Sequence, residues 1–360
     1  MKLLIFLLSI IKISEATIYY VRSEIGSNSN DGLTPQTALA TLANAASRVS
    51  PGDEIDSVGL FTNFNYGSGR YTNRPSVMTI STSNITVRGN GASVLRYDGA
   101  SGISISGGTN FVTIEGFEIE GPAQQINYTM AIANRFRNST TEAKNFYSNR
   151  GIVGWGPSHH ITVRDCYVHD TCASGIRFND ADYITIEDCT VTRTSYWSSA
   201  AESAIVMAES LAIDNSTDIK MIFRRNALFE NWNRIPFYQP SHDGLSAYPD
   251  YGEASQNYIL DGQGLYVTRS DDHYMGTFLF ENNIVASSGK NGINFDGTPA
   301  GGYVVFSNVA LYCVPHHSNS LNLTLETQSY CEIQHAVSKR CVRFHTKRTR
   351  GSEQSCRCCG

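Results

Sequence analysis

Apolar and polar residues alternate in two copies of one short pattern between Ser158 and Ser195. The segment ITVRDCYV at 161–168 returns 23 residues later as ITIEDCTV at 184–191. Alternation with a period of two is typical of strands, and recurrence at intervals of 20–50 residues is typical of repeat architectures. The pattern therefore predicts an all-β solenoid in which each copy forms part of one coil.

Further copies of the pattern begin near residues 85, 112, 221, 278 and 303. Their shared inward corner position is occupied by Phe117, Cys166, Cys189, Asn226, Asn283 and Asn308. Asn side chains stacked in neighbouring coils are expected to hydrogen-bond along the solenoid. A second strand in each coil opens at a small residue, namely Gly151, Gly175, Ala204, Gly244, Gly264 and Gly292. The 57 residues from Asn226 to Asn283 predict two coils.

One outward position carries charges that alternate in sign. It reads Arg88, Glu115, Arg164, Glu187, Arg224 and Glu281. Opposite charges on neighbouring strands stabilise a sheet by about 0.2–1 kcal/mol per pair. We interpret these six residues as scaffold.

The N-terminal segment MKLLIFLLSIIKISEA is typical of a secretory signal peptide, with one lysine, an apolar run and a small-residue exit. The alternative is a buried N-terminal strand. A first strand is expected after Thr17, and the segment Ala38–Val49 predicts a short helix that ends at Pro51-Gly52. Such a helix would cap the open end of the solenoid.

The order of strand, DGLTPQTALATLANA helix, PGDEI strand and rungs resembles secreted proteins of the pectin-lyase-like superfamily. The resemblance covers residues 17–312 and implies a right-handed parallel β-helix with a short N-terminal capping helix. Within that superfamily, the chain is weakly similar to family nine polysaccharide lyases.

Export and a mild net charge narrow the classes of partner. A formal charge of -5 argues against nucleic acid, and no later stretch is apolar enough to insert into a membrane. We expect a secreted, extracellular monomer whose partner is a polysaccharide or glycan, acidic by the resemblance. Sequons at Asn84, Asn127, Asn138, Asn215 and Asn322 are expected to be exposed glycan acceptors.

Nine cysteines leave the pairing open. Cys166 and Cys189 hold equivalent positions about 4.8 Å apart, so they form either a disulfide or an unbridged inward stack. The basic, Cys-rich tail at 313–360 shows no rung in its sequence. It is either a compact disulfide cap or not the native continuation of the chain.

Excess length between coils must leave the solenoid as loops. The longest such segments are Glu120–Arg150 and Asn231–Asp272. The second holds Trp232, His242, Tyr248 and Tyr251, which we predict to bind substrate because aromatic faces stack on sugar rings. A solvated loop with its aromatics tucked onto the solenoid is the alternative.

The resemblance implies two chemistries. In lyases, Lys or Arg removes the proton α to a uronate carboxyl, and Ca²⁺ or a basic residue neutralises that carboxylate. Lys290 is the candidate base, with Arg269 as a second catalytic residue. The segment HDGLS at 242–246 looks like a degraded DDGID calcium signature, so Asp243, Asp271 and Asp272 are the candidate metal ligands for Ca²⁺.

Hydrolases instead need two carboxylates that flank the scissile bond. Asp271 and Asp272 are adjacent, and neighbouring residues on a strand point to opposite faces, so this chemistry is disfavoured. The sequence thus predicts a carbohydrate-active lyase of β-elimination type on acidic polysaccharide. The competing hypothesis is a non-catalytic glycan-binding or structural β-helix protein.

Overall fold

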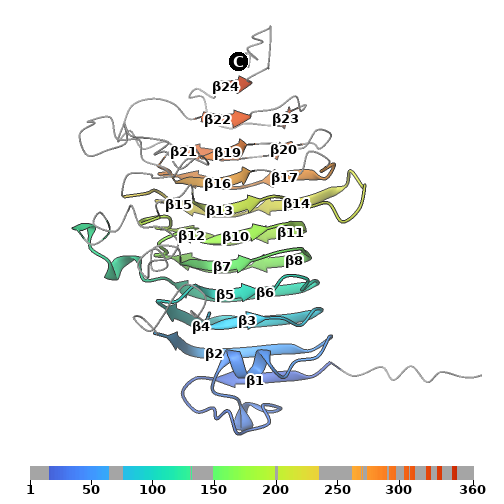
Figure 1. The fold of residues 1–360 in the computed structure, drawn as a ribbon, viewed down its shortest axis with the longest axis vertical. Coiled ribbons are helices and arrows are strands. Elements are labelled where there is room, and N and C mark those ends of the chain that lie inside the picture. Colours follow the sequence, from blue (N-terminus) through green and yellow to red (C-terminus); the bar gives the residue numbers. More distant parts are fainter. Residues whose placement is uncertain are drawn as a thin grey trace, which may run out of the picture.

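The computed structural model describes residues 16–64, 76–129, 131, 149–198, 202–234, 262–268, 270, 274–289, 292–296, 304–307, 309–312, 322–325, 331–334 and 343–346. Within these ranges the strands lie as the rungs of one ladder, from β1 at the N-terminal end to β24 at the other (Figure 1). Every strand pairing is parallel.

Two sheets line the ladder. The nine-stranded sheet holds β3 (Met78–Ile80), β5 (Ser101–Ile105), β7 (Arg150–Gly154), β10 (Ile176–Asn179), β13 (Ser203–Ala208), β16 (Gln263–Thr268), β19 (Ile293–Asp296), β22 (Asn322–Leu325) and β24 (Arg343–Thr346). The fifteen-stranded sheet begins with β1 (Ile18–Arg22), β2 (Glu54–Asn63), β4 (Ile85–Tyr97) and β6 (Val112–Glu120).

Beyond β6 the fifteen-stranded sheet divides into two arms, because β6 pairs with both β8 and β9. The first arm is β8 (Ser158–Arg164), β11 (Ala181–Glu187), β14 (Ile219–Arg224), β17 (Thr277–Glu281), β20 (Val304–Ser307) and β23 (Cys331–Gln334). The second arm is β9 (Tyr167–His169), β12 (Thr190–Thr192), β15 (Ala227–Phe229), β18 (Ile284–Ala286) and β21 (Ala310–Tyr312). Each coil therefore passes through the first arm, the second arm and the nine-stranded sheet in turn.

The core is a stack of inward side chains from successive coils. Ile161, Ile184 and Met221 are in register and have no exposed surface. Further along, the rings of Phe223 and Phe280 stack with centroids 5.0 Å apart. Alternate residues of each strand thus fill one continuous apolar interior, as the period of two predicts. The expected register of the last of these rungs is wrong by one residue, since Val304 rather than Tyr303 pairs with Phe278.

The N-terminal cap is shorter than predicted. Leu39 forms a parallel bridge with Val21, and this pairing holds the segment around it extended. A 3₁₀ turn spans Pro35–Thr37, and α1 covers only Leu42–Ala46, with the Thr41 side chain accepting a hydrogen bond from the Asn44 amide. The helix expected over 38–49 is therefore wrong in extent, because its first residues pair with β1.

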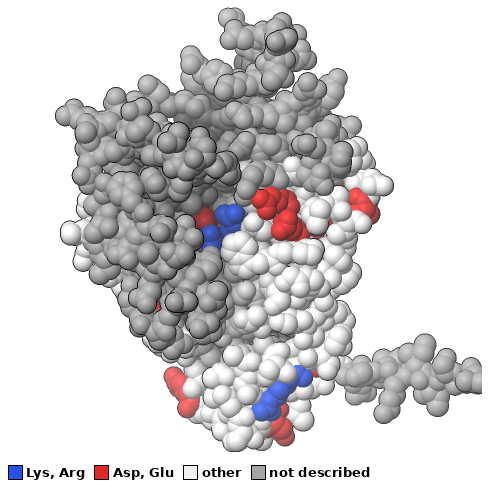
Figure 2. Space-filling model, in the orientation of Figure 1, with Lys and Arg blue, Asp and Glu red and all other residues white. Residues whose placement is uncertain are grey.

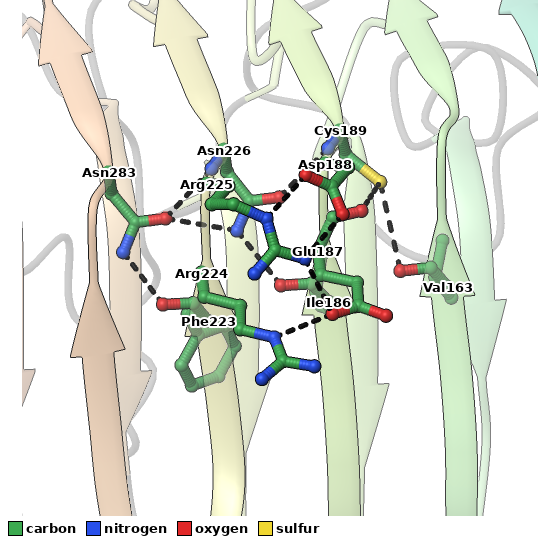
Figure 3. Close-up of polar contacts among 10 residues, drawn as sticks. All are labelled: Val163, Ile186, Glu187, Asp188, Cys189, Phe223, Arg224, Arg225, Asn226 and Asn283. Carbon is green, nitrogen blue, oxygen red and sulfur yellow. Dashed lines mark hydrogen bonds and ion pairs between the residues drawn. The ribbon is translucent and has the colours of Figure 1, made fainter.

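The predicted asparagine ladder is present. Asn226 Nδ2 donates to Asn283 Oδ1 at 3.0 Å and to the Ile186 carbonyl at 2.9 Å, while Asn283 Nδ2 donates to the Phe223 carbonyl (Figure 3). Because β14 pairs directly with β17, these two asparagines lie on neighbouring coils. The expectation of two coils between them is wrong. Gly244, expected to open a strand there, lies outside the described residues.

The alternating charges form the predicted ladder. Strand register places Arg88 beside Glu115, Glu115 beside Arg164, Arg164 beside Glu187, Glu187 beside Arg224 and Arg224 beside Glu281. Ion pairs join Arg88 and Arg164 to Glu115, and Arg224 Nε lies 2.6 Å from Glu187 Oε2 (Figure 3). These side chains line the outside of the first arm as scaffold.

A buried lysine fastens the loop between β13 and β14. Lys220 has no exposed surface, and its Nζ lies 3.2 Å from Asp182 Oδ2 and 2.7 Å from Asp214 Oδ1. Burial lowers the pKa of Lys220, but hydrogen bonds to Asp214 and Asp182 outweigh it and leave the pKa raised. Tyr274 donates its hydroxyl to Asp182 Oδ1 at 2.8 Å, and the amides of Tyr183 and Ile213 also donate to that carboxylate.

Cys166 and Cys189 are buried and form no disulfide with each other, so of the two predicted arrangements the structure has the unbridged stack. In the tail, β23 pairs with β20, and β22 pairs with β19 and β24. The expectation that no rung follows Tyr312 is therefore wrong for these strands, which continue both sheets. Whether the tail is the native continuation stays open, and the predicted signal peptide lies outside the described residues except for Ala16.

Candidate functional site

Beyond the N-terminal cap, the two longest segments between described strands occur at the same corner of the coil, between the second arm and the nine-stranded sheet. Residues 121–149 connect β6 to β7, and residues 230–262 connect β15 to β16. At the next corner along the coil, a single residue separates β10 from β11. We call the first of these places the loop-bearing corner. Binding residues tend to collect on loops held by a rigid scaffold.

An apolar cluster separate from the main core lies at the base of these loops. Its members are Ala123, Ile126, Ala131, Cys172, Tyr196 and Trp197. Trp197 Nε1 donates to the Ala123 carbonyl at 2.8 Å and thereby joins two of the departing segments. The described part of the corner is thus a packed surface.

A buried ionic group lies where the nine-stranded sheet leaves this corner. Glu202, just before β13, has a 3% exposed side chain and accepts from Arg150 of β7 at 2.5 Å and from Arg177 of β10 at 3.2 Å. Ser174, just before β10, donates its hydroxyl to the same carboxylate. We call these four residues the Glu202 group.

The two guanidinium groups keep Glu202 ionised. Burial alone would raise the pKa of this carboxyl, but the charges of Arg150 and Arg177 and the hydrogen bond from Ser174 lower the pKa to about 2. Two arginines and one carboxylate leave the Glu202 group with one net positive charge at neutral pH.

An exposed indole lies against this group. Trp155 follows β7, is 40% exposed, and has its ring centroid 5.1 Å from the Arg150 guanidinium carbon and 5.9 Å from that of Arg177. These distances fall within the range of cation–π attraction. Aromatic surface and cationic groups therefore meet at one place on the nine-stranded sheet.

Buried polar atoms without partners lie nearby. Ser203 Oγ and Gln263 Oε1 are buried and accept or donate no hydrogen bond in the described part of the chain. The two residues face each other across β13 and β16, and Ser203 directly follows Glu202. Buried polar groups are normally satisfied, and these two unpartnered atoms lie inside the protein next to the Glu202 group.

A second polar group lies on the other side of the corner, at the end of the second arm. His169 Nδ1 lies 2.6 Å from Asp170 Oδ2, and Arg193 Nε donates to Asp170 Oδ1 at 2.8 Å. Burial alone would raise the pKa of Asp170. Hydrogen bonds from His169, Arg193 and Gln124 outweigh burial and lower this pKa strongly. His169 also approaches Glu118 Oε1 at 3.3 Å. With its two carboxylates this group is less suited to an anion than the Glu202 group.

On the face shown in Figure 2, charged side chains are not gathered into one large patch. In the view of Figure 2, lysine, arginine and acidic side chains form a few separate groups, some of them beside atoms drawn in grey. An acidic ligand would therefore be recognised locally, by named side chains.

Most of the site residues predicted from sequence lie outside the described residues. These are Arg269, His242, Asp243, Tyr248, Tyr251, Asp271, Asp272 and Lys290. Trp232 is described and lies on the loop-bearing corner, where it is half-buried against the apolar cluster. The Arg234 guanidinium carbon lies 5.9 Å from its ring. Its predicted role in substrate binding stays a prediction.

The Glu202 group and Trp155 were missed by the sequence reasoning. A signal was available, because Arg150 and Ser174 each precede the recurrent glycine that opens the strand, and Glu202 lies two residues before Ala204. Comparing those preceding positions from coil to coil would have placed them on one corner.

Comparison with known proteins bears on the fold. A family model described as a right handed beta helix region matches residues 68–235. The fold is a right-handed parallel β-helix. The predicted fold class, which is also the fold that the resemblance implies, is confirmed. No curated protein matches the chain.

Solved structures with similar folds carry different names. Pectate lyase Pel9A has 14% identity and a TM-score of 0.41, with 86% of this chain and 80% of that chain covered. The GH136 lacto-N-biosidase from Eubacterium ramulus has 12% identity, a TM-score of 0.41 and coverage of 83% and 58%. The Agl-KA catalytic domain has 11% identity, a TM-score of 0.40 and coverage of 79% and 48%. Such values leave the activity to be argued from this chain's own residues.

Two further observations concern membranes and metals. Among the described residues, no helix is long and apolar enough to cross a membrane. In the same residues, no three His, Cys, Asp or Glu side chains are grouped as a metal site. The three predicted calcium ligands lie outside this part of the chain.

Proposed function

We propose that the chain binds acidic polysaccharide along the nine-stranded sheet, from the loop-bearing corner to Trp155, and cleaves it by β-elimination. The observation that carries the proposal is the contact of the exposed Trp155 indole with the guanidinium groups of Arg150 and Arg177. An aromatic face suits the apolar face of a sugar ring, and a guanidinium pairs with a carboxylate in two-pronged geometry.

Arg177 is the cation best placed to meet a uronate. Its Nε donates to Asn179 Oδ1 at 2.8 Å on the same strand, and Nη1 donates to Glu202. The side chain is therefore held in one orientation before substrate arrives, which lowers the entropy lost on binding.

Lys290 is the proposed base. Lys290 itself lies outside the described residues. On either side of it, the Gly289 amide donates to the Asn231 carbonyl and the Gly292 carbonyl accepts from the Leu265 amide. In β-elimination the base takes the proton α to the uronate carboxyl, a carbon–carbon double bond forms, and the β glycosidic oxygen leaves. Arginine beside the carboxylate stabilises the negative charge that develops there.

Asp243, Asp271 and Asp272 are the residues proposed to hold Ca²⁺. Ca²⁺ would neutralise a uronate carboxylate. Arg269 is retained as a second catalytic candidate.

Following ultraviolet absorbance of the unsaturated product tests the activity. The full-length protein is incubated with polyuronates of different sugar composition, with Ca²⁺ and with chelator. Growth of absorbance on at least one polyuronate, lost in Lys290→Ala and kept in Lys347→Ala, is the expected result. No absorbance on any polyuronate would refute the lyase proposal.

A non-catalytic glycan-binding protein is the second candidate, because the exposed Trp155 and the two arginines could bind an acidic glycan without any catalytic base. It predicts binding of an acidic polysaccharide without any unsaturated product. Measured affinity together with silent absorbance would select it over the lyase.

A further inference from the structure

Three aromatic rings form a column on the outside of the solenoid, at the corner where the chain enters the first arm. Phe111 and His160 stack with centroids 4.6 Å apart, and His160 and Tyr183 stack at 4.5 Å. All three residues have positive φ, between 50° and 56°, and lie one coil apart. Left-handed backbone is uncommon for such bulky residues, so the column is a costly arrangement.

Phe111 begins the column and is 52% exposed. One face of its ring lies on His160, and the opposite face points along the solenoid axis toward the preceding coil. That coil carries Asn84 at the matching position, because the Ile85 amide donates to the Phe111 carbonyl and the Asn84 amide donates to the Asn110 carbonyl. A large apolar face is thus left uncovered beside Asn84.

Asn84 is the acceptor position of the sequon Asn84-Ile85-Thr86. It is exposed, has a φ of 57°, and its side chain makes no hydrogen bond in the described part of the chain. One coil further out lies Gly52, where a Cβ would meet nothing within 4 Å. The rung on that side of Asn84 therefore places no side chain at this corner.

We propose that Asn84 carries an N-linked glycan whose first sugar packs on the free face of Phe111, at the end of the aromatic column. In the transfer, Asn84 Nδ2 forms a bond to C1 of the sugar and loses one proton. The bond from C1 to the pyrophosphate oxygen of a lipid-linked oligosaccharide donor breaks, and the lipid pyrophosphate leaves. The apolar face of the sugar then lies on the phenyl ring, whose π face is electron-rich.

Asn215 provides an internal comparison. It is also exposed and belongs to a sequon, in the loop fastened by Lys220. Its neighbour Asp214 accepts from the Tyr183 hydroxyl at 2.9 Å. No exposed phenyl face lies one rung from it among the described strand pairings, so a glycan there would add solubility without the stacking contact.

The test uses the full chain, with its own first 16 residues, expressed in a eukaryotic secretory host. Peptide mass spectrometry after enzymatic release of glycans in heavy-oxygen water reports occupancy of Asn84. Wild type and Thr86→Ser, which keeps the sequon, should show it, and Thr86→Val, which removes the sequon but leaves Asn84 in place, should not. An unmodified Asn84 in the wild-type protein, or failure of the chain to be glycosylated at all, overturns the proposal.

A double-mutant cycle tests the stacking contact. Loss of the glycan through Thr86→Val should lower the Tm by about 2 °C when Phe111 is present. The same change in a Phe111→Ala background should alter the Tm by much less. Equal shifts in the two backgrounds would show that the sugar does not lie on Phe111. Each comparison is also made in protein from a non-glycosylating host, where Thr86→Val should shift the Tm equally in both backgrounds.

Discussion

Asn226 Nδ2 and Asn283 Oδ1 lie 3.0 Å apart, although 57 residues separate the two asparagines in the chain. Both side chains are 2% exposed and stand at the same corner of adjacent coils (Figure 3). The contact shows that the whole segment between β15 and β16 is inserted into one coil without disturbing the stacking of the scaffold. A long loop can therefore carry function here while the rungs keep their register.

Asn226→Ala is expected to lower the free energy of unfolding by about 2–4 kcal/mol, since it leaves the amide of Cys189 and the carbonyl of Ile186 buried without partners. Urea unfolding of the purified protein measures this. Gln125→Ala, at an exposed position, is the control and should change stability by less than about 0.5 kcal/mol. Equal stability of the two variants would contradict the ladder's role.

Lys220→Met should destabilise the protein by about 3–5 kcal/mol, because Asp182 would remain buried without its cation. Arg224→Met removes an ion pair with Glu187 at a position 36% exposed and should cost under about 1 kcal/mol. Adding Asp182→Asn to Lys220→Met should recover part of the loss. Chemical denaturation distinguishes these variants, and a small effect of Lys220→Met would show that the buried pair is dispensable.

The Glu202 group predicts an acid-sensitive contribution to stability. The pKa of Glu202 falls from an ordinary value of 4.5 to about 2 in the folded protein. A carboxyl whose pKa is lower in the folded protein stabilises the fold at pH values above its pKa in the unfolded chain. This contribution is lost as the pH falls from about 4.5 toward 2. The loss amounts to about 3 kcal/mol.

Unfolding measured at pH 6 and pH 3 should thus show a smaller pH effect in Glu202→Gln than in wild type. Glu202→Gln itself should be less stable at pH 6, because Arg150 and Arg177 lose their shared partner. If the two proteins lose equal stability on acidification, Glu202 is not the titrating group.

Cys166 and Cys189 should stay reduced and unreactive in the native protein. Burial raises the pKa of the Cys189 thiol well above its ordinary value, so little thiolate is available. Peptide mass spectrometry after alkylation should find both residues labelled only when the protein is unfolded first. A disulfide-linked peptide containing both would contradict the unbridged stack.

The rungs could be predicted from sequence because each inward residue repeats in kind from coil to coil. The charge ladder from Arg88 to Glu281 followed from the same repetition. The start of helix α1 could not be predicted, because Leu39 pairs with Val21 through backbone atoms and the residue types give no sign of this pairing. Likewise, the coil containing Asn226 and Asn283 looked like two coils, since an inserted loop and an extra rung have similar lengths.

The candidate site was harder to predict, for a physical reason. Glu202 meets Arg150 and Arg177 only because three coils bring residues 52 and 25 positions apart to one corner. Their types are unremarkable in sequence, and only a comparison of the positions before each recurrent strand would have grouped them. The role of Trp155 was equally hard to predict, because it depends on which strands lie beside this residue.

The central claim is that Trp155 and the adjacent arginines bind acidic glycan, and calorimetric titration with an acidic oligosaccharide tests it most directly. Trp155→Ala should raise Kd about tenfold, the effect expected for loss of one stacking contact of about 1.4 kcal/mol. Leu211→Ala, at an exposed apolar position on a different loop, should leave Kd unchanged. Equal affinity of wild type and Trp155→Ala would contradict the claim.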